Sequence, residues 1–337
     1  MPPKKDMIIL TEGGRENGFG HITRCISIAN AFQSKGVNIN FIVHGDNSVK
    51  SLLSDFKYSI YNWIDGFNKI ELLVKDSLLV LIDSIQVSNE KIINISKLDT
   101  VVMHIDDDEQ RNIINSGFIL DWTINRESSF KLSERKSKVT YLLGSKYTPL
   151  RSAFYGNYTK FIVNDTISQI MITFGGSDIR NMTPRILNML VDYYPKVRKK
   201  VVIGGGCYNI NYIKSFSNEN TSFVFDASAH TMVKIMNESD IAIASGGQTL
   251  YELAKVGIPT IAIILVENAM HDTNGWEKAG FLKNAGWYCD KEIIKNVYKE
   301  IIHLQSKIER KRMSDNGARF IGKNGANLLA GTILKRI

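Results

Sequence analysis

The sequence predicts an α/β protein of two Rossmann-like domains, each with a parallel sheet covered by helices. Short apolar segments of strand length alternate with longer segments whose apolar residues recur at helical spacing. This order is typical of right-handed β-α-β units. The alternation stops at residues 144–165, which are polar and aromatic, and then starts again. Because the 337 residues also amount to about twice a common domain length, we expect domains at residues 1–150 and 166–320.

The first domain is expected to begin with a strand and a helix. Residues 21–35 repeat apolar side chains at helical spacing, and Gly36 follows as the helix end. The segment 77–83 is continuously apolar between Ser77 and Asp83, as in a parallel strand that is buried on both faces. The strands predicted for this domain are residues 7–10, 38–43, 77–83 and 100–105.

The same alternation predicts the elements of the second domain. A helix over residues 183–193 has Pro184 in its first turn, where proline is favoured. The final stretch, residues 292–337, is mostly helical in pattern. The remaining predicted helices are residues 232–237 and 247–256, and the predicted strands are residues 169–174, 200–203, 223–225, 241–244 and 259–265.

The formal net charge of +8 does not by itself indicate a nucleic-acid partner. Lysine and arginine residues are scattered, with local excesses only at residues 196–200 and 307–312, whereas nucleic-acid binding requires them to gather on one face. Such short basic groups are usually solvated surface. We therefore expect no nucleic acid as a partner and a mild positive field that suits a phosphate-bearing small ligand.

The cysteine and hydropathy patterns predict a cytoplasmic protein. Cys25, Cys207 and Cys289 form no CxxC pair, so neither a disulfide framework nor a zinc site is expected. The apolar residues 7–10 are too few for a signal peptide, and no apolar stretch reaches the roughly 18 residues of a membrane span. The histidines show no metal-ligand spacing, so we expect no metal and no cofactor.

Glycine-bearing turns follow three of the predicted strands. In open α/β sheets, ligands bind beyond the carboxyl ends of the strands, and glycine lets backbone N–H groups approach a ligand closely. Tight strand-to-helix turns also need glycine, so a single turn does not distinguish a ligand contact from a structural role. The turns are Gly13-Gly14 through Gly18-Phe19-Gly20-His21, Gly175-Gly176-Ser177-Asp178, and Ser245-Gly246-Gly247-Gln248-Thr249.

The third turn is the best candidate for binding phosphate. The start of the following helix offers unpaired N–H donors and a partial positive charge, and Ser245 or Gln248 could cap it. Glu252, about one turn into the helix, could accept hydrogen bonds from ribose hydroxyls. The first turn lacks the third glycine of G-x-G-x-x-G, which Thr23 replaces, and no Walker A lysine is present. NAD and ATP are therefore disfavoured.

His21 is the candidate catalytic residue. It stands at the start of a predicted helix, where the N-terminus favours a neutral ring that can act as a base. A histidine that only caps or packs is the alternative interpretation. Asp83 and Asp106 also end strands and are candidates for contacting substrate hydroxyl or amide groups, whereas Asp107 and Asp108 are expected to cap a helix.

Several motifs resemble those of a known enzyme family. Gly18-Phe19-Gly20-His21-Ile22-Thr23-Arg24 resembles the Gly-x-Gly-His-x-x-Arg loop of the UDP-2,4-diacetamido-2,4,6-trideoxy-β-L-altropyranose hydrolases of pseudaminic acid biosynthesis, which related spore-coat polysaccharide proteins share. The turns at Gly175 and Ser245 are similar to later signatures of this family. Asp106, Asn125 and Arg151 fall in family order, so the resemblance covers most of the chain, from about residue 8 to about residue 288.

The resemblance implies a glycosyltransferase-B type fold, close to the MurG transferases, in which two Rossmann-like domains face a central cleft. His21 would act as a general base on a water that attacks the anomeric carbon of a UDP-sugar, without a metal. Arg24 would contact substrate, as would the residues Gly18, Gly20, Asp83, Asp106, Asn125, Arg151 and Asn268. The nucleotide would be bound by Gly175, Gly176, Ser245, Gly246, Gly247, Gln248 and Glu252.

Two departures from the family pattern leave the sugar and its acceptor open. The family often has an aromatic residue where this chain has Ile85, and its Asn-Gln pair near the last strand is Asn268-Ala269 here. Residues 321–337 resemble longer spore-coat relatives and would return as a helix to the first domain. We expect a monomer that acts on a UDP-sugar. The leading hypothesis is a hydrolase; the alternatives are a glycosyltransferase and a non-catalytic sugar-nucleotide-binding protein.

Overall fold

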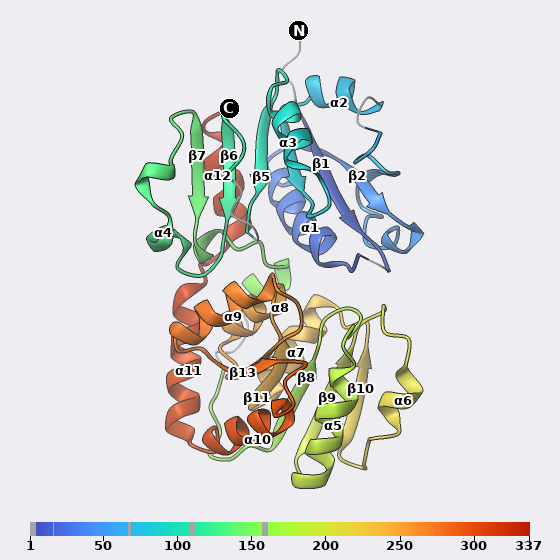
Figure 1. Ribbon diagram of the computed structural model, residues 1–337, viewed down its shortest axis with the longest axis vertical. Coiled ribbons are helices and arrows are strands. Elements are labelled where there is room, and N and C mark those ends of the chain that lie inside the picture. The colour runs from blue at the N-terminus through green and yellow to red at the C-terminus, as the bar shows by residue number, and fades with distance from the viewer. Residues whose placement is uncertain (1–4, 16, 67–68, 108–111, 157–160) are drawn as a thin grey trace. The chain divides into compact units, whose positions relative to one another are not determined.

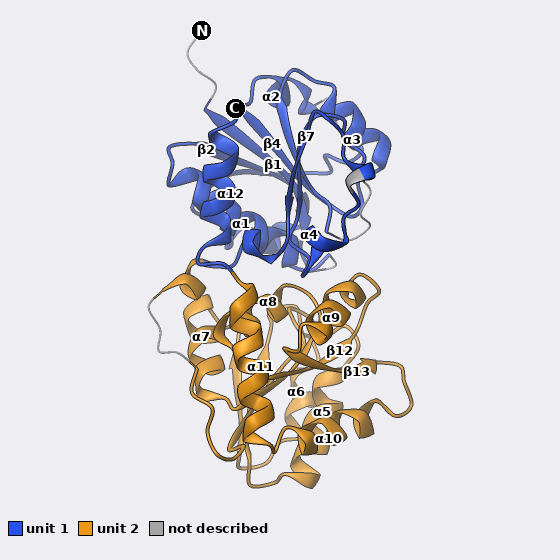
Figure 2. Cartoon of the chain, turned by 90° about the vertical axis from the view of Figure 1, so that its left-hand side faces the viewer, with its two compact units in different colours: residues 1–151, 322–337 blue, residues 152–321 orange. Residues whose placement is uncertain are grey.

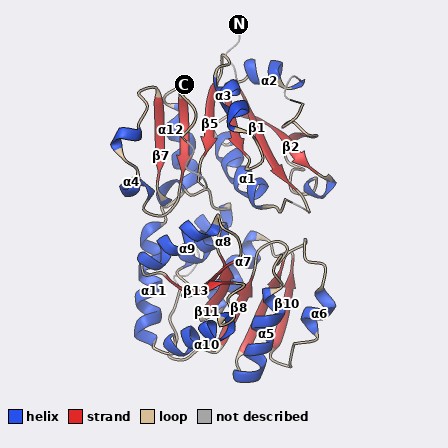
Figure 3. Ribbon diagram, viewed as in Figure 1, coloured by secondary structure: helices blue, strands red, loops and turns tan. Residues whose placement is uncertain are grey.

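The computed structural model describes residues 5–15, 17–66, 69–107, 112–156 and 161–337. The chain divides into two compact units (Figure 2), of which unit 1 comprises Met1–Arg151 and Gly322–Ile337 and unit 2 comprises Ser152–Ile321. Each unit contains one sheet with helices on its two faces (Figure 3). The predicted architecture of two parallel α/β domains is therefore confirmed.

Unit 1 is built on a seven-stranded parallel sheet in the order β3-β2-β1-β4-β5-β6-β7 (Figure 1). The chain starts in the middle of the sheet, adds strands on one side, and returns to place β4 on the other side of β1. The strands are β1 (Asp6–Gly13), β2 (Asn38–Gly45), β3 (Lys57–Ile60), β4 (Leu79–Asp83), β5 (Val101–Ile105), β6 (Gly117–Asp121) and β7 (Val139–Leu143).

Helices cover both faces of this sheet. Side chains of successive strand residues point to opposite faces, so Ile8 and Leu10 of β1 pack with Val74 and Ile92 of the helices on one side. On the other side α1 packs against β1 and against α12, the last helix of the chain. The α-helices are α1 (Gly20–Gln33), α2 (Glu71–Lys75), α3 (Asn89–Ser96), α4 (Arg126–Ser129) and α12 (Gly325–Leu334), and the 3₁₀ helices are η1 (Asn47–Val49), η3 (Leu132–Glu134) and η4 (Ser145–Tyr147).

Helix α12 begins in close contact with the segment around Thr148, just after η4. A Cβ atom on Gly325 would lie 2.3 Å from the carbonyl oxygen of Thr148, which explains why glycine begins this helix. Leu329, Ala330 and Ile333 of α12 are buried. The last helix therefore contributes to the core of the unit that contains the first strand.

Unit 2 contains a six-stranded parallel sheet in the order β10-β9-β8-β11-β12-β13. One face forms a core with α5 and α10, and α8 packs with α11. The strands are β8 (Gln169–Thr173), β9 (Arg198–Ile203), β10 (Thr221–Phe225), β11 (Ile241–Ser245), β12 (Thr260–Ile264) and β13 (Leu282–Trp287). The helices are η5 (Ser152–Tyr155), α5 (Met182–Tyr193), α6 (Ile210–Lys214), α7 (Ala229–Glu238), α8 (Gln248–Val256), α9 (Ala269–Lys278), α10 (Ile293–His303) and α11 (Lys307–Phe320).

Four strands lack a clear sequence signal. β3 lies at the edge of its sheet, and Lys57 and Ser59 on it are exposed. β6 and β7 are separated by the four-residue helix α4 and the short η3 rather than by a periodic helix, so no β-α alternation marks them. β13 carries polar residues and Gly286 within its length. Within the described part of the chain, no helix has both the length and the apolar character needed to cross a membrane.

Candidate active site

The turn after β1 brings the start of α1 to the carboxyl end of the sheet in unit 1. The backbone N–H of Gly14 donates to the carbonyl oxygen of Gly18 at 3.0 Å, so the loop closes on itself before the helix begins. A Cβ atom on Gly13 would lie 2.4 Å from Cγ1 of Ile22, so only glycine permits this approach of helix to strand. His21, the second residue of α1, thereby reaches the ends of β1 and β4.

His21 is held by a carboxylate from the neighbouring strand. Its Nδ1 lies 2.8 Å from Oδ1 of Asp83, the last residue of β4. Arg24 Nη2 also lies 3.2 Å from this nitrogen, but the shorter contact to a carboxylate, which only accepts, places the proton on Nδ1. The other ring nitrogen, Nε2, then carries the lone pair of the neutral ring. This is the arrangement in which a histidine acts as a general base with an orienting carboxylate.

Arg24 connects two carboxylates beneath His21. Its Nε and Nη2 donate to the two oxygens of Asp83 at 2.8 and 2.5 Å, and its Nη1 donates to Asp107 at 2.6 Å. Burial by itself would raise the pKa of Asp83, but the Arg24 guanidinium and His21 hold that pKa well below its usual range. Trp122 covers the guanidinium, with its ring centre 5.0 Å away. Asp83 is therefore a fixed negative charge beneath the imidazole.

Glu12 is a further carboxylate at this site that the sequence analysis did not select. It is only 1% exposed, and its Oε1 lies 3.9 Å from Nε2 of His21. Its carboxylate accepts hydrogen bonds from Ser84 Oγ and, at 3.2 Å, from the backbone N–H of Ile85. It follows the apolar segment 7–10 after one residue, Thr11, whereas Asp83 comes directly after its apolar segment.

The other residues predicted for the first domain are arranged around this centre in different ways. Asp107 was expected to cap a helix, but its side chain pairs with Arg24 instead, because the end of β5 lies close to α1. Asp106 accepts from the backbone N–H of Asn112 at 2.7 Å. Asn125 has a left-handed backbone and is exposed at the start of α4. Arg151 is the last residue of the first segment of unit 1, Gly18 has a positive φ, and Gly20 begins α1. Asp108 lies outside the described residues.

Asp121, at the end of β6, is a buried carboxylate near the same edge. Burial raises its pKa to about 6, although hydrogen bonds from Thr123 and the charge of Arg126 act in the opposite direction. An unfolded aspartate titrates near pH 4, so between about pH 4 and pH 6 the folded protein keeps a proton that the unfolded chain has lost. Asp121 therefore lowers the free energy of unfolding as the pH rises through this window.

We expect Asp121→Asn to remove this pH dependence, because an amide resembles the protonated acid and does not titrate. The free energy of unfolding of the wild type, minus that of the variant, should fall between about pH 4 and pH 6 and stay constant above. Urea unfolding of both proteins across this range provides the measurement. Parallel pH profiles for the two proteins would contradict the assignment of the titration to Asp121.

In unit 2, two glycine turns follow the adjacent strands β8 and β11. The chain leaves β8 towards β9 on one side, and β11 lies on the other, so this is the switch point at which ligands bind in open α/β sheets. Gly175 and Gly247 both have positive φ angles, 76° and 103°, and a Cβ atom on either would meet nothing within 4 Å. Both turns therefore leave open space beside backbone that glycine alone adopts readily.

The start of α8 differs in detail from the expectation. Gly247, rather than Ser245 or Gln248, occupies the N-cap position, and as a glycine it has no side chain that could cap the helix. Ser245 is the buried last residue of β11, and Gln248 is the first residue of the helix. The structure places Gln248 directly after an uncapped Gly247, where first-turn N–H groups can meet an anion.

Gly246 has a packing role that its neighbour Gly247 lacks. A Cβ atom there would lie 2.6 Å from Cβ of Ala269 and 2.9 Å from Oγ1 of Thr273, both on α9. We expect Gly246→Ala to lower the free energy of unfolding by about 1–3 kcal/mol through overpacking. Gly331→Ala in α12, where the new Cβ meets nothing within 4 Å, should instead raise it by about 0.5–1 kcal/mol. Chemical unfolding of both variants measures these two changes. Equal changes in the free energy of unfolding would contradict the packing role of Gly246.

The remaining residues predicted for the second domain lie in the turns and helices that follow the strands of unit 2. Gly176 accepts a hydrogen bond from the backbone N–H of Gly206 at 2.9 Å, which ties two turns together. Glu252 is buried in α8, whereas Asn268 is exposed at the start of α9. Arg180 was not predicted; its guanidinium lies 4.5 Å from the ring centre of Tyr288. In the sequence, Arg180 could have been selected because it follows the glycine turn after β8 closely.

No cluster of three or more histidine, cysteine, aspartate or glutamate side chains suited to a metal ion occurs among the described residues.

The chain matches no family profile, but it is similar to several curated proteins. It is 26% identical over 266 residues to an uncharacterized protein of Methanocaldococcus jannaschii, covering 76% of this chain and 54% of that protein. It is 23% identical over 300 residues to the Helicobacter pylori pseudaminic acid cytidylyltransferase and UDP-2,4-diacetamido-2,4,6-trideoxy-β-L-altropyranose hydrolase. This match covers 86% of this chain and 48% of that protein. The third, spore coat polysaccharide biosynthesis protein SpsG of Bacillus subtilis, is 20% identical over 266 residues, 77% of each chain. The chain thus spans about half the length of the first two relatives.

Solved structures share the fold over nearly the whole chain. MurG of Acinetobacter baumannii matches with a TM-score of 0.65 and 12% identity over 99% of this chain and 100% of that one. The glycotransferase of kitacinnamycin matches with a TM-score of 0.66 and 10% identity over 100% of both chains. MnaA of S. aureus, solved with UDP, matches with a TM-score of 0.65 and 14% identity over 99% of this chain and 98% of that one. The fold is therefore of the glycosyltransferase-B type.

Proposed function

We propose that this protein is a nucleotide-sugar enzyme that transfers the sugar of a UDP-sugar to an oxygen nucleophile. The observation that carries the proposal is the hydrogen bond between His21 Nδ1 and Asp83, 2.8 Å long, which leaves Nε2 to accept a proton. The glycine turns after β8 and β11 support UDP as the leaving group, because an uncapped helix start favours a diphosphate. The structural similarity to MnaA, which was solved with UDP, is consistent with this nucleotide.

The chemistry is a direct displacement at the anomeric carbon. The nucleophile loses its O–H proton to Nε2 of His21 as its oxygen bonds to the anomeric carbon. The bond from that carbon to the phosphate oxygen breaks, and UDP leaves with the electron pair. Asp83 stabilises the imidazolium that forms, and a diphosphate leaving group is stabilised by backbone N–H donors of the kind that a glycine turn supplies. A single displacement of this kind inverts the anomeric configuration.

We propose a saccharide hydroxyl as the nucleophile, in the synthesis of a polysaccharide. Two observations favour it: the solved neighbours include proteins named as transferases, and one curated relative is named as a polysaccharide biosynthesis protein. Water is the second candidate, and the observation that favours it is the similarity to a protein whose name includes a UDP-sugar hydrolase. The same base and leaving group serve both reactions.

The experiment incubates the purified full chain with a panel of UDP-sugars, with and without a mixture of monosaccharides as acceptors. UDP release is followed by a coupled assay, and the sugar product is identified by mass spectrometry. A disaccharide whose formation accompanies UDP release supports the transferase. Release at the same rate without acceptor, with free sugar as the product, rejects it in favour of the hydrolase. Binding of UDP-sugars without turnover would reject both reactions.

A further inference from the structure

The site around His21 holds a second carboxylate, that of Glu12 on β1. Oε1 of Glu12 lies 3.9 Å from Nε2 of His21, while Oδ1 of Asp83 on β4 lies 2.8 Å from Nδ1. The imidazole ring therefore stands between two carboxylates, one beside each ring nitrogen. The displacement at the anomeric carbon uses Asp83 alone as the partner of His21, so it gives Glu12 no part in the reaction.

The position of Glu12 follows from the pairing of β1 with β4. Thr11 is the register partner of Asp83, so Glu12 lies beside the residues that follow Asp83. The hydroxyl of Ser84 donates to Oε2 of Glu12, and the backbone N–H of Ile85 donates to Oε1 at 3.2 Å. The three residues from Asp83 to Ile85 therefore hold both carboxylates beside the ring.

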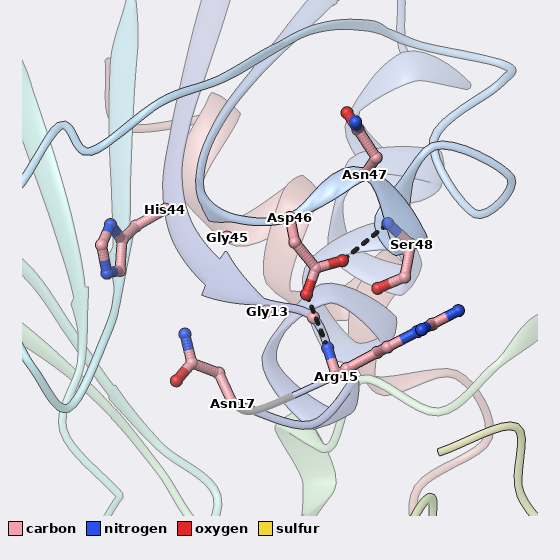
Figure 4. A pocket seen from close by; sticks show the side chains of 9 residues that line it. Gly13, Arg15, Asn17, His44, Gly45, Asp46, Asn47 and Ser48 are labelled. Atoms are coloured by element: carbon pink, nitrogen blue, oxygen red, sulfur yellow. Dashed lines mark hydrogen bonds between the residues drawn. The ribbon is translucent and has the colours of Figure 1, made fainter.

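The backbone that follows Glu12 is fixed by the neighbouring end of β2. A Cβ atom on Gly45 would lie 1.7 Å from the carbonyl oxygen of Gly13, so the two backbones are in direct contact. Asp46 accepts a hydrogen bond from the backbone N–H of Arg15 at 2.9 Å (Figure 4). The residues of this contact line the open pocket that Figure 4 shows. Glu12 is thus held by β4 through its side chain and by β2 through the backbone that follows it.

The negative charge of Glu12 is not balanced by the contacts that hold its side chain. Glu12 is 1% exposed, and burying a charge is unfavourable unless an opposite charge or hydrogen bonds compensate it. Ser84 and Ile85 supply only neutral donors, and His44, the register partner of Glu12 on β2, does not pair with it. Among the described residues, His21 is the only side chain within ion-pair distance that can carry a positive charge.

The interaction between Glu12 and His21 changes when the ring takes up a proton. Nε2 of the neutral ring carries a lone pair, and 3.9 Å is too long for a hydrogen bond, so the neutral ring gains little from the carboxylate. A protonated Nε2 carries a donor and a positive charge, which a buried carboxylate at this distance stabilises. An interaction that strengthens only as the proton is transferred lowers the barrier without tightening substrate binding.

From these observations we infer that Glu12 is a positioning residue of the reaction, which stabilises the imidazolium form of His21 through its negative charge. The nucleophile gives its proton to Nε2, and the resulting N–H faces Oε1 of Glu12, while Asp83 keeps the proton on Nδ1. The inference rests on the proposed function, because it requires His21 to act as the base. It applies equally to a hydroxyl and to water as the nucleophile.

The test measures kcat and KM of the full chain for a UDP-sugar in the coupled UDP assay. Glu12→Gln keeps the volume of the side chain and removes its charge. Glu12→Ala removes the whole carboxylate, and its assay is repeated with added formate, an anion, or formamide, a neutral molecule of similar shape. The matched control is Glu238→Gln, which removes a carboxylate with a 47% exposed side chain at the end of α7. Thermal unfolding shows whether each variant folds, and Glu12→Gln decides the test if Glu12→Ala does not fold.

We expect Glu12→Gln to lower kcat by about 10–100-fold, a part of the roughly 10²–10⁴-fold that a positioned base contributes. KM should change little, because the charge acts in the transition state, and Glu238→Gln should match the wild type. Formate should restore most of the rate that Glu12→Ala loses, and formamide should not, since only the anion returns the charge.

Three results would overturn the inference. Wild-type kcat in Glu12→Gln would show that the reaction does not use the charge. A formate effect no larger than that of formamide would show that the carboxylate only holds the turn after β4. A raised KM at unchanged kcat would place Glu12 in substrate binding instead.

Failure of this inference is distinguishable from failure of the proposed function. If His21→Ala loses UDP release while Glu12→Gln retains it, only the role of Glu12 is wrong. If the wild type releases UDP from no UDP-sugar, the proposed function fails and the role of Glu12 fails with it.

Discussion

His21→Ala is expected to lower the rate of UDP release from a UDP-sugar by about 10²–10⁴-fold, the usual contribution of a positioned general base. Nδ1 is occupied by Asp83 at 2.8 Å, so Nε2 is the atom that accepts the proton of the nucleophile. Alanine removes this acceptor and leaves Asp83 paired with Arg24. The measurement is kcat in a coupled UDP assay, with KM for the UDP-sugar expected to change little, because the base acts in the transition state.

The matched control for this experiment is His303→Ala. His303 lies on α10 with 55% of its side chain exposed, so its removal tests the loss of a histidine without touching the site. Its kcat should equal that of the wild type. A His21→Ala enzyme that retained wild-type kcat would eliminate His21 as the base and return it to a packing role at the start of α1.

Arg24→Ala is expected to destabilise unit 1 by about 3–5 kcal/mol, the usual cost of removing one partner of a buried ion pair. Asp83 is 1% exposed and receives two hydrogen bonds from Arg24, so the substitution leaves a buried carboxylate without its main counter-charge. The measurement is urea-dependent hydrogen exchange of backbone amides in β1 and β4, which reports on unit 1 separately from unit 2. The matched control is Lys35→Ala, which removes one exposed positive charge just beyond the C-cap of α1.

The pH dependence of this loss follows from the depressed pKa of Asp83. A carboxylate whose folded pKa lies below its unfolded value stabilises the fold above the unfolded pKa, and this contribution disappears as the pH falls through the folded pKa. Because the Arg24 charge contributes to that depression, Arg24→Ala raises the folded pKa of Asp83, and the stability difference between wild type and variant should shrink as the pH falls below the unfolded pKa of aspartate. Equal stability of Arg24→Ala and Lys35→Ala would show that the pair contributes nothing to the fold.

The class of fold was predictable because it depends on local patterns. The fully apolar segment that became β4 is buried at all five positions, since a central parallel strand has helices on both faces. The exposed edge strand β3 and the strands β6 and β7 had no comparable pattern, because exposure on one side or a short connection removes the signal that alternation provides. The glycine turns were visible for the same local reason, since particular backbone angles require glycine.

Local residue patterns predicted the two-domain α/β architecture, the strand ends that carry glycine, and a histidine at the start of α1. The surroundings of that histidine follow from contacts between distant parts of the chain. Asp83 lies 62 positions away from His21 in the chain, and Glu12 and His44 become neighbours through strand pairing. These contacts depend on which strands lie side by side, and strand order is set by packing of the whole sheet rather than by the spacing of residues along the chain.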